Sequence, residues 1–393
     1  MFSIRTYNAI SEKGLSRFEP ELYQVGADVA QPDGIVLRSH KLHDEALPDS
    51  VLAVARAGAG VNNIPVDEYT RRGIVVFNTP GANANAVKEL VIAGLLLSSR
   101  GIIQGRDFVN TLGNMQDASE MSALLEKKKK EFAGNELYGK TLGVVGLGAI
   151  GSMIANVALA LGMRVVGYDP AISVEAAWRL SSQVTRMENL QSLLSEVDYL
   201  TLHVPAIDAT RNLLNADTLA LMKNDAAILN FARDAIVDDK AVVDALNAGK
   251  LRQYVCDFPM PNLIGHEKVI ALPHIGASTA EAEENCAVMA VDQLKDYLKN
   301  GNIVNSVNFP VTSMPRTNGA CRITFTNENV SGVLGHVLTY LAEQNVNVID
   351  MVNKSRNDVA YNILDLEEMP SDDVIQAIRD EEHVISLRVV CKS

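Results

Sequence analysis

The chain has 393 residues, 47% of them hydrophobic, and its formal net charge at neutral pH is −13. This length predicts two or three domains, and the negative charge argues against a general affinity for nucleic acids or anionic membranes. No apolar run reaches the roughly 18 residues of a membrane span, and the N-terminal residues lack the apolar run of a signal peptide. We therefore expect a cytoplasmic protein. Its four cysteines show no metal or redox spacing, so we expect reduced thiols and no metal.

Three short apolar runs in the first hundred residues predict buried parallel strands, at residues 35–37, 51–55 and 74–77. Each run ends at polar or glycine residues. Because ligands of open α/β sheets bind at the carboxyl ends of the strands, we expect these ends to form one wall of a cleft. A predicted helix at residues 88–100 follows. The lysines at 127–130 lie in a polar stretch that predicts a solvated helix face, with substrate attraction as the alternative.

A glycine-rich turn follows the next predicted strand, at residues 141–145, and opens an apolar helix. Gly146, Gly148 and Gly151 fit the pattern G-x-G-x-x-G. In a dinucleotide site the first glycine permits the tight turn, the second lets backbone approach the phosphates, and the third lets the helix pack closely. The helix N-terminus offers unpaired N–H groups and a partial positive charge. The order of strand, turn and helix predicts a dinucleotide site.

Asp169 ends the following predicted strand, residues 163–168, near the spacing expected of the acid that binds the ribose hydroxyls. A carboxylate here favours NAD, since it would repel the 2′-phosphate of NADP. The alternative is that Asp169 only caps the turn before Pro170.

Further strands are predicted at residues 199–204, 226–230, 253–257 and 269–272, with helices between them such as 239–248. A long predicted helix at residues 279–300 ends at Gly301 and could return to the first lobe. Residues 308–316 are typical of a linker. The tail predicts the order β-α-β-β-α-β, a ferredoxin-like pattern that suits a regulatory module. We expect a substrate-binding domain at residues 1–97 and 283–307, a Rossmann domain at 98–282 and a regulatory domain at 317–393.

Two side chains that directly follow predicted strands could carry chemistry. Arg233 could clamp the carboxylate of a 2-oxo acid and polarise the adjacent carbonyl; the alternative is a surface arginine paired with Asp234 or Asp238. His274 could accept the proton released when a secondary alcohol is oxidised. Its alternative is a capping or core histidine, but the glycine and small residues after it leave room for a ligand.

The sequence resembles the D-isomer-specific 2-hydroxy-acid dehydrogenase family over residues 30–300, and its tail resembles an ACT domain. The matching segments are residues 36–39, 55–63, 72–80, 139–151, 168–170, 230–233 and 273–279. The resemblance implies two Rossmann-like parallel-sheet lobes, the first of them discontinuous, plus a ferredoxin-like ACT domain. It also implies association through the nucleotide domain into homodimers or homotetramers.

The resemblance implies NAD-dependent oxidation of 3-phospho-D-glycerate to 3-phosphooxypyruvate, the first step of L-serine biosynthesis. Arg233 would bind the carboxylate and His274 would act as the acid/base. Contacts to NAD are expected, several through backbone, from Thr79, Gly146, Gly148, Ala149, Ile150, Gly151, Asp169, Val204, Phe231, Asp257 and Gly276. Arg56 would hold the substrate phosphate in a pocket with Ser39, Ala57, Gly58 and Asn83, and Arg38 or a residue of a neighbouring subunit could be a further ligand.

The chain departs from the family pattern at one catalytic position. The family carries a glutamate, in a sequence like Asp-Val-Phe-x-x-Glu-Pro, that pairs with the histidine and raises its pKa. Here residues 257–262 contain no glutamate, and Pro261 or Asn262 falls near the expected place. Glu267 is the only glutamate left before His274 and is expected to be a surface residue paired with Lys268. His274 is predicted to work without this partner or to borrow a carboxylate from elsewhere.

The tail carries polar residues at positions that hold an amino acid, L-serine, at a dimer interface in regulated relatives. Asn327, Asn329 and Asn347 match these positions by resemblance, although a solvated turn would look the same. Val330 and Ser331 depart from the family pattern, in which proline precedes the glycine.

Two other functions stay open on the sequence. The first is reduction of another small 2-oxo acid, such as hydroxypyruvate or 2-oxoglutarate. The second is a non-catalytic, nucleotide-sensing corepressor or scaffold, which the same fold supports.

Overall fold

The computed structural model describes residues 1–317, 319 and 321–391 and divides into two compact units. Unit 1 comprises Met1–Asn83 and Ala280–Ser393, and unit 2 comprises Ala84–Thr279. The first division falls ahead of the predicted domain boundary after residue 97, because helix α3 (Ala84–Ser99) packs on α6 (Ala149–Ala160) and β10 (Ala226–Asn230) of unit 2. The second likewise falls just before the predicted boundary at 283, at the start of helix α11 (Ala280–Asn300).

Unit 1 contains a five-stranded parallel sheet in the order β2-β1-β3-β4-β5. Its strands are β1 (Phe2–Thr6), β2 (Tyr23–Gly26), β3 (Gly34–Leu37), β4 (Ala53–Arg56) and β5 (Val75–Phe77). The apolar runs predict β3, β4 and β5. They do not reveal β1 and β2, because in each of these strands only one side chain is buried and no apolar run forms.

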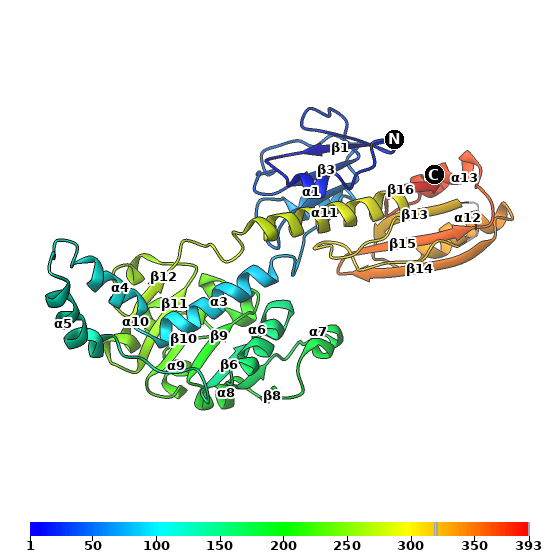
Figure 1. The fold of residues 1–393 in the computed structure, drawn as a ribbon. Helices are drawn as coiled ribbons and strands as arrows, with labels where there is room; N and C mark the ends of the chain where they lie inside the picture. Colours follow the sequence, from blue (N-terminus) through cyan, green and yellow to red (C-terminus); the bar gives the residue numbers. More distant parts are fainter. Residues whose placement is uncertain (318, 320, 392–393) are drawn as a thin grey trace. The chain divides into compact units, whose positions relative to one another are not determined.

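Helix α11 returns the chain to this sheet, as the sequence suggested (Figure 1). It packs on α1 (Glu12–Leu15) so closely that a Cβ added at Gly14 would lie 2.6 Å from the Ala287 Cβ. Leu294 and Leu298 are fully buried against the strands. Helix α2 (Val66–Arg71) lies between β4 and β5 in the chain.

Unit 2 is built on a seven-stranded parallel sheet in the order β12-β11-β10-β9-β6-β7-β8. The strands are β6 (Thr141–Val145), β7 (Arg164–Tyr168), β8 (Thr185–Arg186), β9 (Tyr199–Leu202), β10 (Ala226–Asn230), β11 (Leu251–Cys256) and β12 (Val269–Ala271). Every residue of β6, β9 and β10 is buried. Continuous apolar runs predict such strands, since helices cover both faces of a parallel sheet.

The helices of unit 2 surround this sheet, and the two predicted at residues 88–100 and 239–248 are found within four residues of those limits. The unit 2 helices are α3, α4 (Ile102–Asn110), α5 (Ala118–Lys128), α6 (Ala149–Ala160), α7 (Val174–Arg179), α8 (Leu190–Glu196), α9 (Ala216–Leu221) and α10 (Asp239–Asn247). Lys128 and Lys129, at the end of α5, pair with Glu131 and Glu126. The lysine run thus lies at the end of a helix with no buried residue, as the solvated-face interpretation requires.

The C-terminal module, residues 317–391 as described, has the predicted β-α-β-β-α-β order. Its elements are β13 (Cys321–Glu328), α12 (Val333–Glu343), β14 (Val348–Arg356), β15 (Val359–Leu366), α13 (Asp372–Asp380) and β16 (Val384–Cys391). The four strands form an antiparallel sheet in the order β14-β15-β13-β16. The predicted fold class, two parallel-sheet α/β lobes and a ferredoxin-like module, is confirmed.

The segment predicted as a linker is packed rather than open. Phe309 and Thr312 are fully buried, and the Asn308 side chain accepts from the Val76 N–H at 2.9 Å and donates to the Ile74 carbonyl at 2.9 Å. The sequence suggested only a linker, but here the Asn308 side chain satisfies backbone groups at the edge of the sheet.

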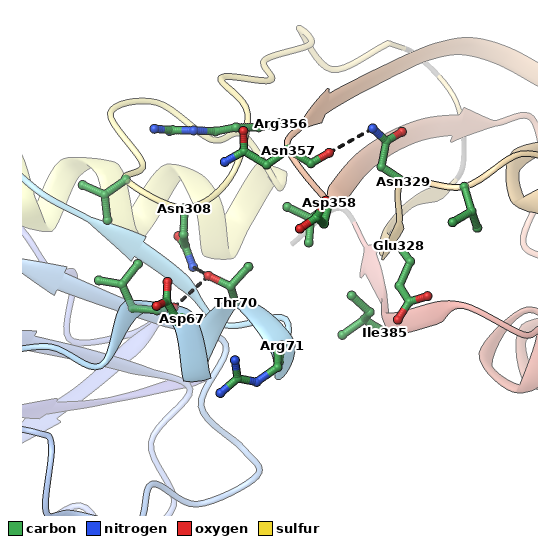
Figure 2. A pocket seen from close by; sticks show the side chains of 14 residues that line it. Asp67, Thr70, Arg71, Asn308, Glu328, Asn329, Arg356, Asn357, Asp358 and Ile385 are labelled. Atoms are coloured by element: carbon green, nitrogen blue, oxygen red, sulfur yellow. Dashed lines mark hydrogen bonds between the residues drawn. The ribbon is translucent and has the colours of Figure 1, made fainter. Parts of the chain in front are cut away.

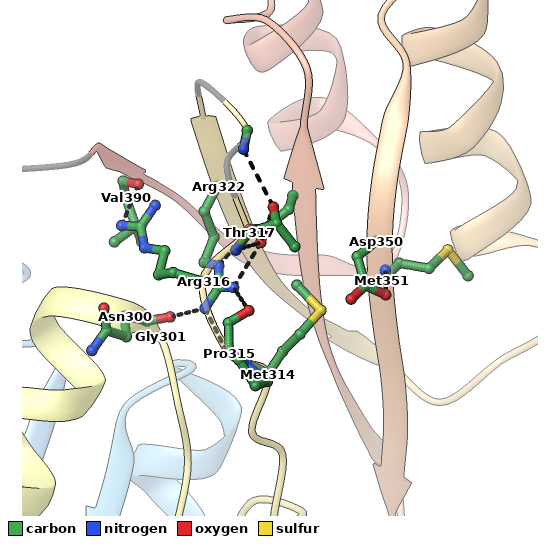
Figure 3. A network of polar contacts seen from close by, with 12 residues as sticks. Asn300, Gly301, Met314, Pro315, Arg316, Thr317, Arg322, Asp350, Met351 and Val390 are labelled. Atoms are coloured by element: carbon green, nitrogen blue, oxygen red, sulfur yellow. Dashed lines mark hydrogen bonds and ion pairs between the residues drawn. The ribbon is translucent and has the colours of Figure 1, made fainter.

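A buried ion pair holds the module to the end of α11 (Figure 3). The Arg322 guanidinium, fully buried, donates to both Asp365 carboxylate oxygens, at 2.6 and 2.9 Å. It also donates to the carbonyls of Asn300, Met314 and Pro315. Asp365 accepts further from the backbone and hydroxyl of Thr317. Both charged groups of this buried pair are therefore satisfied by hydrogen bonds.

Cys256 and Cys286 are buried free thiols, and Cys321 is buried as well. Burial raises the pKa of Cys256 to about 11, so this thiol is protonated and unreactive at neutral pH. The Cys391 side chain, predicted to be reduced as well, lies outside the described part. No helix in the described part of the chain is both long and apolar enough to cross a membrane.

Candidate functional site

The glycine turn after β6 has the backbone geometry that its sequence predicts. Gly146 has φ 90°, a left-handed conformation that favours glycine. A Cβ at Gly151 would lie 1.9 Å from the Gly146 carbonyl oxygen, so only glycine fits there. Gly148 precedes α6 and has no atom within 4 Å of the place its Cβ would take. The first turn of α6, which begins with Ala149 and Ile150, is therefore open to an anion at its N-terminus.

Asp169 stabilises this turn through both oxygens of its carboxylate. Oδ2 accepts from the Leu147 N–H at 2.8 Å and Oδ1 from the Ala171 N–H at 2.9 Å. The carboxylate is thus held beside the glycine turn, and each oxygen keeps a further lone pair. The sequence left two roles open for Asp169, capping of the turn and binding of the ribose hydroxyls, and this geometry is compatible with both.

Arg233 is presented at the end of β10 by a buried asparagine that sequence reasoning missed. Asn230 is 1% exposed; its Nδ2 donates to the Arg233 carbonyl at 2.8 Å and its Oδ1 accepts from the Ala232 N–H at 3.1 Å. The Arg233 side chain is exposed and makes no ion pair with Asp234 or Asp238, the partners of the surface alternative. An asparagine that ends a buried apolar run was the signal available in the sequence.

His274 lies after β12 with its backbone in the left-handed region, at φ 55°. Asp257, 1% exposed, fixes the next two residues: its carboxylate accepts from the Ile275 N–H at 2.8 Å and the Gly276 N–H at 2.7 Å. Such a conformation is rare for histidine and persists only where neighbouring contacts hold it. Asp257 was expected to contact NAD; its side chain is seen to position the His274 loop.

Phe258 connects the two candidate catalytic side chains. Its ring centroid lies 4.5 Å from that of His274, and the Arg233 guanidinium carbon lies 5.6 Å from the same centroid. A cation near an aromatic ring at this distance is attracted by the ring quadrupole. Sequence reasoning missed Phe258, although it directly follows Asp257.

No carboxylate takes the place of the missing glutamate within the part of the chain that the structure describes. The His274 side chain makes no hydrogen bond or ion pair with an acid there, and Glu267 and Asn262 are exposed. Two other predicted NAD contacts of unit 2 lie at strand ends: Val204 is two residues after β9, and Phe231 directly follows β10.

In unit 1, the predicted substrate residues gather at the ends of β3, β4 and β5. The Arg56 Nε donates to Asn63 Oδ1 at 3.1 Å, and Asn63 in turn donates to the carbonyls of Arg38 and His40. The Arg56 guanidinium lies over Gly58, where a Cβ would be 2.3 Å from Nη1. Asn63 was not predicted.

The remaining unit 1 residues differ in exposure. Ser39 is exposed, Asn83 is half-buried, and Ala57 and Thr79 are buried. Arg38, the possible second phosphate ligand, forms an ion pair with Glu283 at 2.8 Å.

The sequence and fold match known proteins. Residues 94–276 match the NAD-binding domain of D-isomer specific 2-hydroxyacid dehydrogenases. The D-3-phosphoglycerate dehydrogenase of Haemophilus influenzae is 32% identical over 371 residues, which are 91% of this chain and 86% of that protein. The chain belongs to the D-isomer specific 2-hydroxyacid dehydrogenases. NAD, the predicted cofactor, is confirmed by the matched domain.

Other members of this dehydrogenase family share part of the chain. The D-3-phosphoglycerate dehydrogenase of Synechocystis sp. is 38% identical over 291 residues, which are 72% of this chain and 50% of that protein. The chain spans about half the length of that relative and of the Methanocaldococcus jannaschii one, 50% and 56%. The structure of NAD+-bound 3-phosphoglycerate dehydrogenase from Entamoeba histolytica superposes with a TM-score of 0.60 at 25% identity, covering 78% of this chain and 98% of that chain.

The three predicted effector residues lie at two different ends of the module sheet. Asn327 and Asn329 lie at the end of β13, where Glu328 pairs with Val359. Asn347 precedes Val348, which pairs with Leu366 opposite Cys321, at the other end of β13. One module therefore cannot gather all three residues around one amino acid.

Proposed function

We propose that the protein oxidises 3-phospho-D-glycerate to 3-phosphooxypyruvate with NAD, the first step of L-serine biosynthesis. The observation that carries this is that Arg233 and His274 both lie close to the Phe258 ring, at the carboxyl end of the parallel sheet, where the glycine turn also lies. Relatives named D-3-phosphoglycerate dehydrogenase support the substrate.

Each residue of the candidate site has a separate role in the proposed reaction. NAD, when bound, accepts the hydride from C2 of the substrate. Arg233 binds the substrate carboxylate through paired N–H donors and polarises the C2–O bond. His274 Nε2 or Nδ1 takes the proton of the C2 hydroxyl, so that loss of hydride and proton leaves the ketone. Asp257 and Asn230 orient these two groups through the backbone bonds described above.

The cofactor fits the residues at the glycine turn. Gly148 leaves open space where phosphates must approach backbone, and the first turn of α6 supplies N–H groups. Asp169 is the residue for the ribose hydroxyls, and Phe231 and Val204 line the neighbouring strand ends.

Arg56, held by Asn63, is proposed to bind the substrate phosphate, in a pocket with Ser39, Gly58 and Asn83. Steady-state kinetics with 3-phospho-D-glycerate and D-glycerate test this. Arg56→Gln should raise KM for the phosphorylated acid and leave the unphosphorylated acid unaffected. If the wild type turns over hydroxypyruvate or 2-oxoglutarate better than 3-phosphooxypyruvate, the alternative function, reduction of another small 2-oxo acid, replaces the proposed one.

The catalytic roles are tested with His274→Gln and Arg233→Lys. Both variants should keep NAD affinity, measured by calorimetry, and lose turnover. NAD binding by the wild type without turnover on any 2-hydroxy acid would favour a nucleotide-sensing corepressor or scaffold.

L-Serine regulation through Asn327, Asn329 and Asn347 is proposed to require a second copy of the chain, because one module separates these residues. Sedimentation should then show at least a homodimer, and dilution to monomers should abolish any serine effect.

A further inference from the structure

Two arginines lie at the carboxyl ends of neighbouring strands in unit 1. Arg56 ends β4, and Arg38 directly follows β3, whose last residue, Leu37, pairs with Arg56. Arg56 is proposed to bind the substrate phosphate, and Arg38 is the candidate second ligand. The cavity of about 700 Å³ that α2 and the C-terminal module line is a different place, since neither arginine belongs to its walls (Figure 2).

Helix α11 brings a carboxylate to the same edge of this sheet. The helix packs on β3, β4 and β5, and Glu283 lies in its first turn. The Glu283 Oε1 lies 2.8 Å from the Arg38 Nη2, so the two side chains form an ion pair. An acidic charge is thus placed directly on a guanidinium that a phosphate would use.

Cys286 shows that both arginines and the glutamate lie near one point of the sheet edge. It follows Glu283 by three residues on α11, a spacing that puts both side chains on one side of the helix, and it is 7% exposed. Burial raises the pKa of the Cys286 thiol. The positive charges of Arg38 and Arg56 lower this pKa and the negative charge of Glu283 raises it, so all three charges act on the same thiol.

The ion pair between Arg38 and Glu283 is open to exchange. The two side chains are 42% and 43% exposed, and an ion pair in contact with water is weak. A phosphate group accepts paired hydrogen bonds from a guanidinium and can therefore take the place of the carboxylate. The displaced carboxylate stays close by, because it is attached to the first turn of α11, where the helix dipole favours a negative charge.

We propose that Glu283 is a specificity-determining residue of the substrate pocket, because it competes with the substrate phosphate for Arg38. The inference rests on the proposed function, which brings a phosphate to this edge of unit 1. A phosphorylated acid must separate Arg38 from Glu283 and then bear the repulsion of the displaced carboxylate. An unphosphorylated acid meets neither cost, so Glu283 narrows the preference for the phosphorylated one.

Steady-state kinetics of Glu283→Gln in the full chain test this role, since glutamine keeps the size of the side chain and removes its charge. KM for 3-phospho-D-glycerate should fall about two- to fivefold, the range expected for an exposed ion pair, at unchanged kcat. KM for D-glycerate should not change. Calorimetry without NAD should show the same fall in Kd for 3-phospho-D-glycerate.

Glu284→Gln is the matched control. It removes the same charge from the next residue of α11, but the Glu284 carboxylate pairs with Lys13, at 2.7 Å, instead of with Arg38. This variant should keep both KM values. The Tm of each variant establishes that it is folded.

A double variant separates competition from a structural role. Arg38→Gln alone should raise KM for 3-phospho-D-glycerate. Adding Glu283→Gln to it should change this KM little, because the guanidinium for which carboxylate and phosphate compete is gone.

Three results would overturn the proposal. If the wild type turns over 3-phospho-D-glycerate but Glu283→Gln leaves its KM unchanged or raises it, competition is wrong and the proposed function stands. An equal fall in KM on the Arg38→Gln background would show that Glu283 acts without Arg38. A wild type that neither binds nor turns over 3-phospho-D-glycerate would contradict the proposed function, and this inference with it.

Discussion

At the scale of single residues, the candidate catalytic groups depend on neighbours that are themselves not reactive. Asp257 and Asn230 are buried, and their side chains form hydrogen bonds with the backbone around His274 and Arg233. Both side chains lie close to the Phe258 ring, whose centroid is 4.5 Å from that of His274 and 5.6 Å from the Arg233 guanidinium carbon. In this chain the family's glutamate is absent, and an aromatic ring is the group seen against the histidine.

Phe258→Leu should lower kcat by roughly tenfold to a hundredfold, because His274 and Arg233 lose the surface that fixes their side chains. Steady-state kinetics across pH measure this. Phe258→Tyr, which keeps the ring, should stay within a few-fold of the wild type. Equal losses in both variants would contradict a role for the aromatic face.

Asp365 is the residue whose ionisation should control acid stability. Burial alone would raise its pKa, but the Arg322 guanidinium and the Thr317 donors outweigh burial and hold the pKa below its ordinary value. Its contribution to the free energy of unfolding is therefore complete above the ordinary aspartate pKa of about 3.9 and is lost as pH falls through the lower folded-state pKa.

Asp365→Asn should lower the free energy of unfolding by about 3 to 5 kcal/mol at pH 7, since it leaves Arg322 as a buried, unpaired charge. Denaturant titration at pH 7 and near pH 3 measures the difference between wild type and variant. The difference should shrink at the lower pH. A difference that stays constant with pH would show that the pair's ionisation does not stabilise the fold.

At the scale of elements, the β6–turn–α6 unit shows how three glycines serve three different purposes. Gly146 provides a left-handed backbone and Gly151 a close approach, whereas Gly148 leaves space that no protein atom fills. Only the last of these relates directly to a ligand.

Gly148→Ala and Gly151→Ala should therefore affect Tm and NAD binding differently. Gly151→Ala brings a Cβ to 1.9 Å from a backbone oxygen and should lower Tm and abolish NAD binding. Gly148→Ala meets no protein atom and should keep the wild-type Tm while weakening NAD binding. Calorimetry and thermal unfolding separate the two. A wild-type NAD affinity in Gly148→Ala would show that the phosphates do not approach this residue.

At the scale of the whole molecule, the C-terminal module satisfies the backbone at the end of α11. Arg388 donates to the carbonyls of Tyr297 and Leu298, at 3.4 and 3.0 Å, and the Tyr361 hydroxyl donates to the Gly301 carbonyl at 2.7 Å. The last carbonyls of a helix have no intrahelical partners, so the module supplies them.

Arg388→Met should increase hydrogen exchange at the amides of the last turn of α11 by roughly tenfold, as loss of these hydrogen bonds lowers local stability by about 1 to 2 kcal/mol. Exchange in β6 and β10 of unit 2 serves as the internal control and should not change. A uniform rise in exchange across the chain would mean global destabilisation instead.

Much of the fold could be predicted because parallel strands buried on both faces appear as continuous apolar runs, as β6, β9 and β10 do. β1 and β2 could not, since their half-buried side chains leave no such run. The glycine turn, Arg233 and His274 were identifiable because each directly follows a predicted strand. Phe258, Asn230 and Asn63 were not, because their roles depend on side chains that meet only in the folded chain.

The sequence by itself determined the parallel-sheet lobes, the ferredoxin-like module and the glycine turn between β6 and α6, since these depend on local patterns of apolar residues and glycine. Only the tertiary structure decided how the segment at 308–316 packs, which charges pair and which remain free. It also separated Asn347 from Asn327 and Asn329. Such relations join residues far apart in the chain, and no local pattern encodes them.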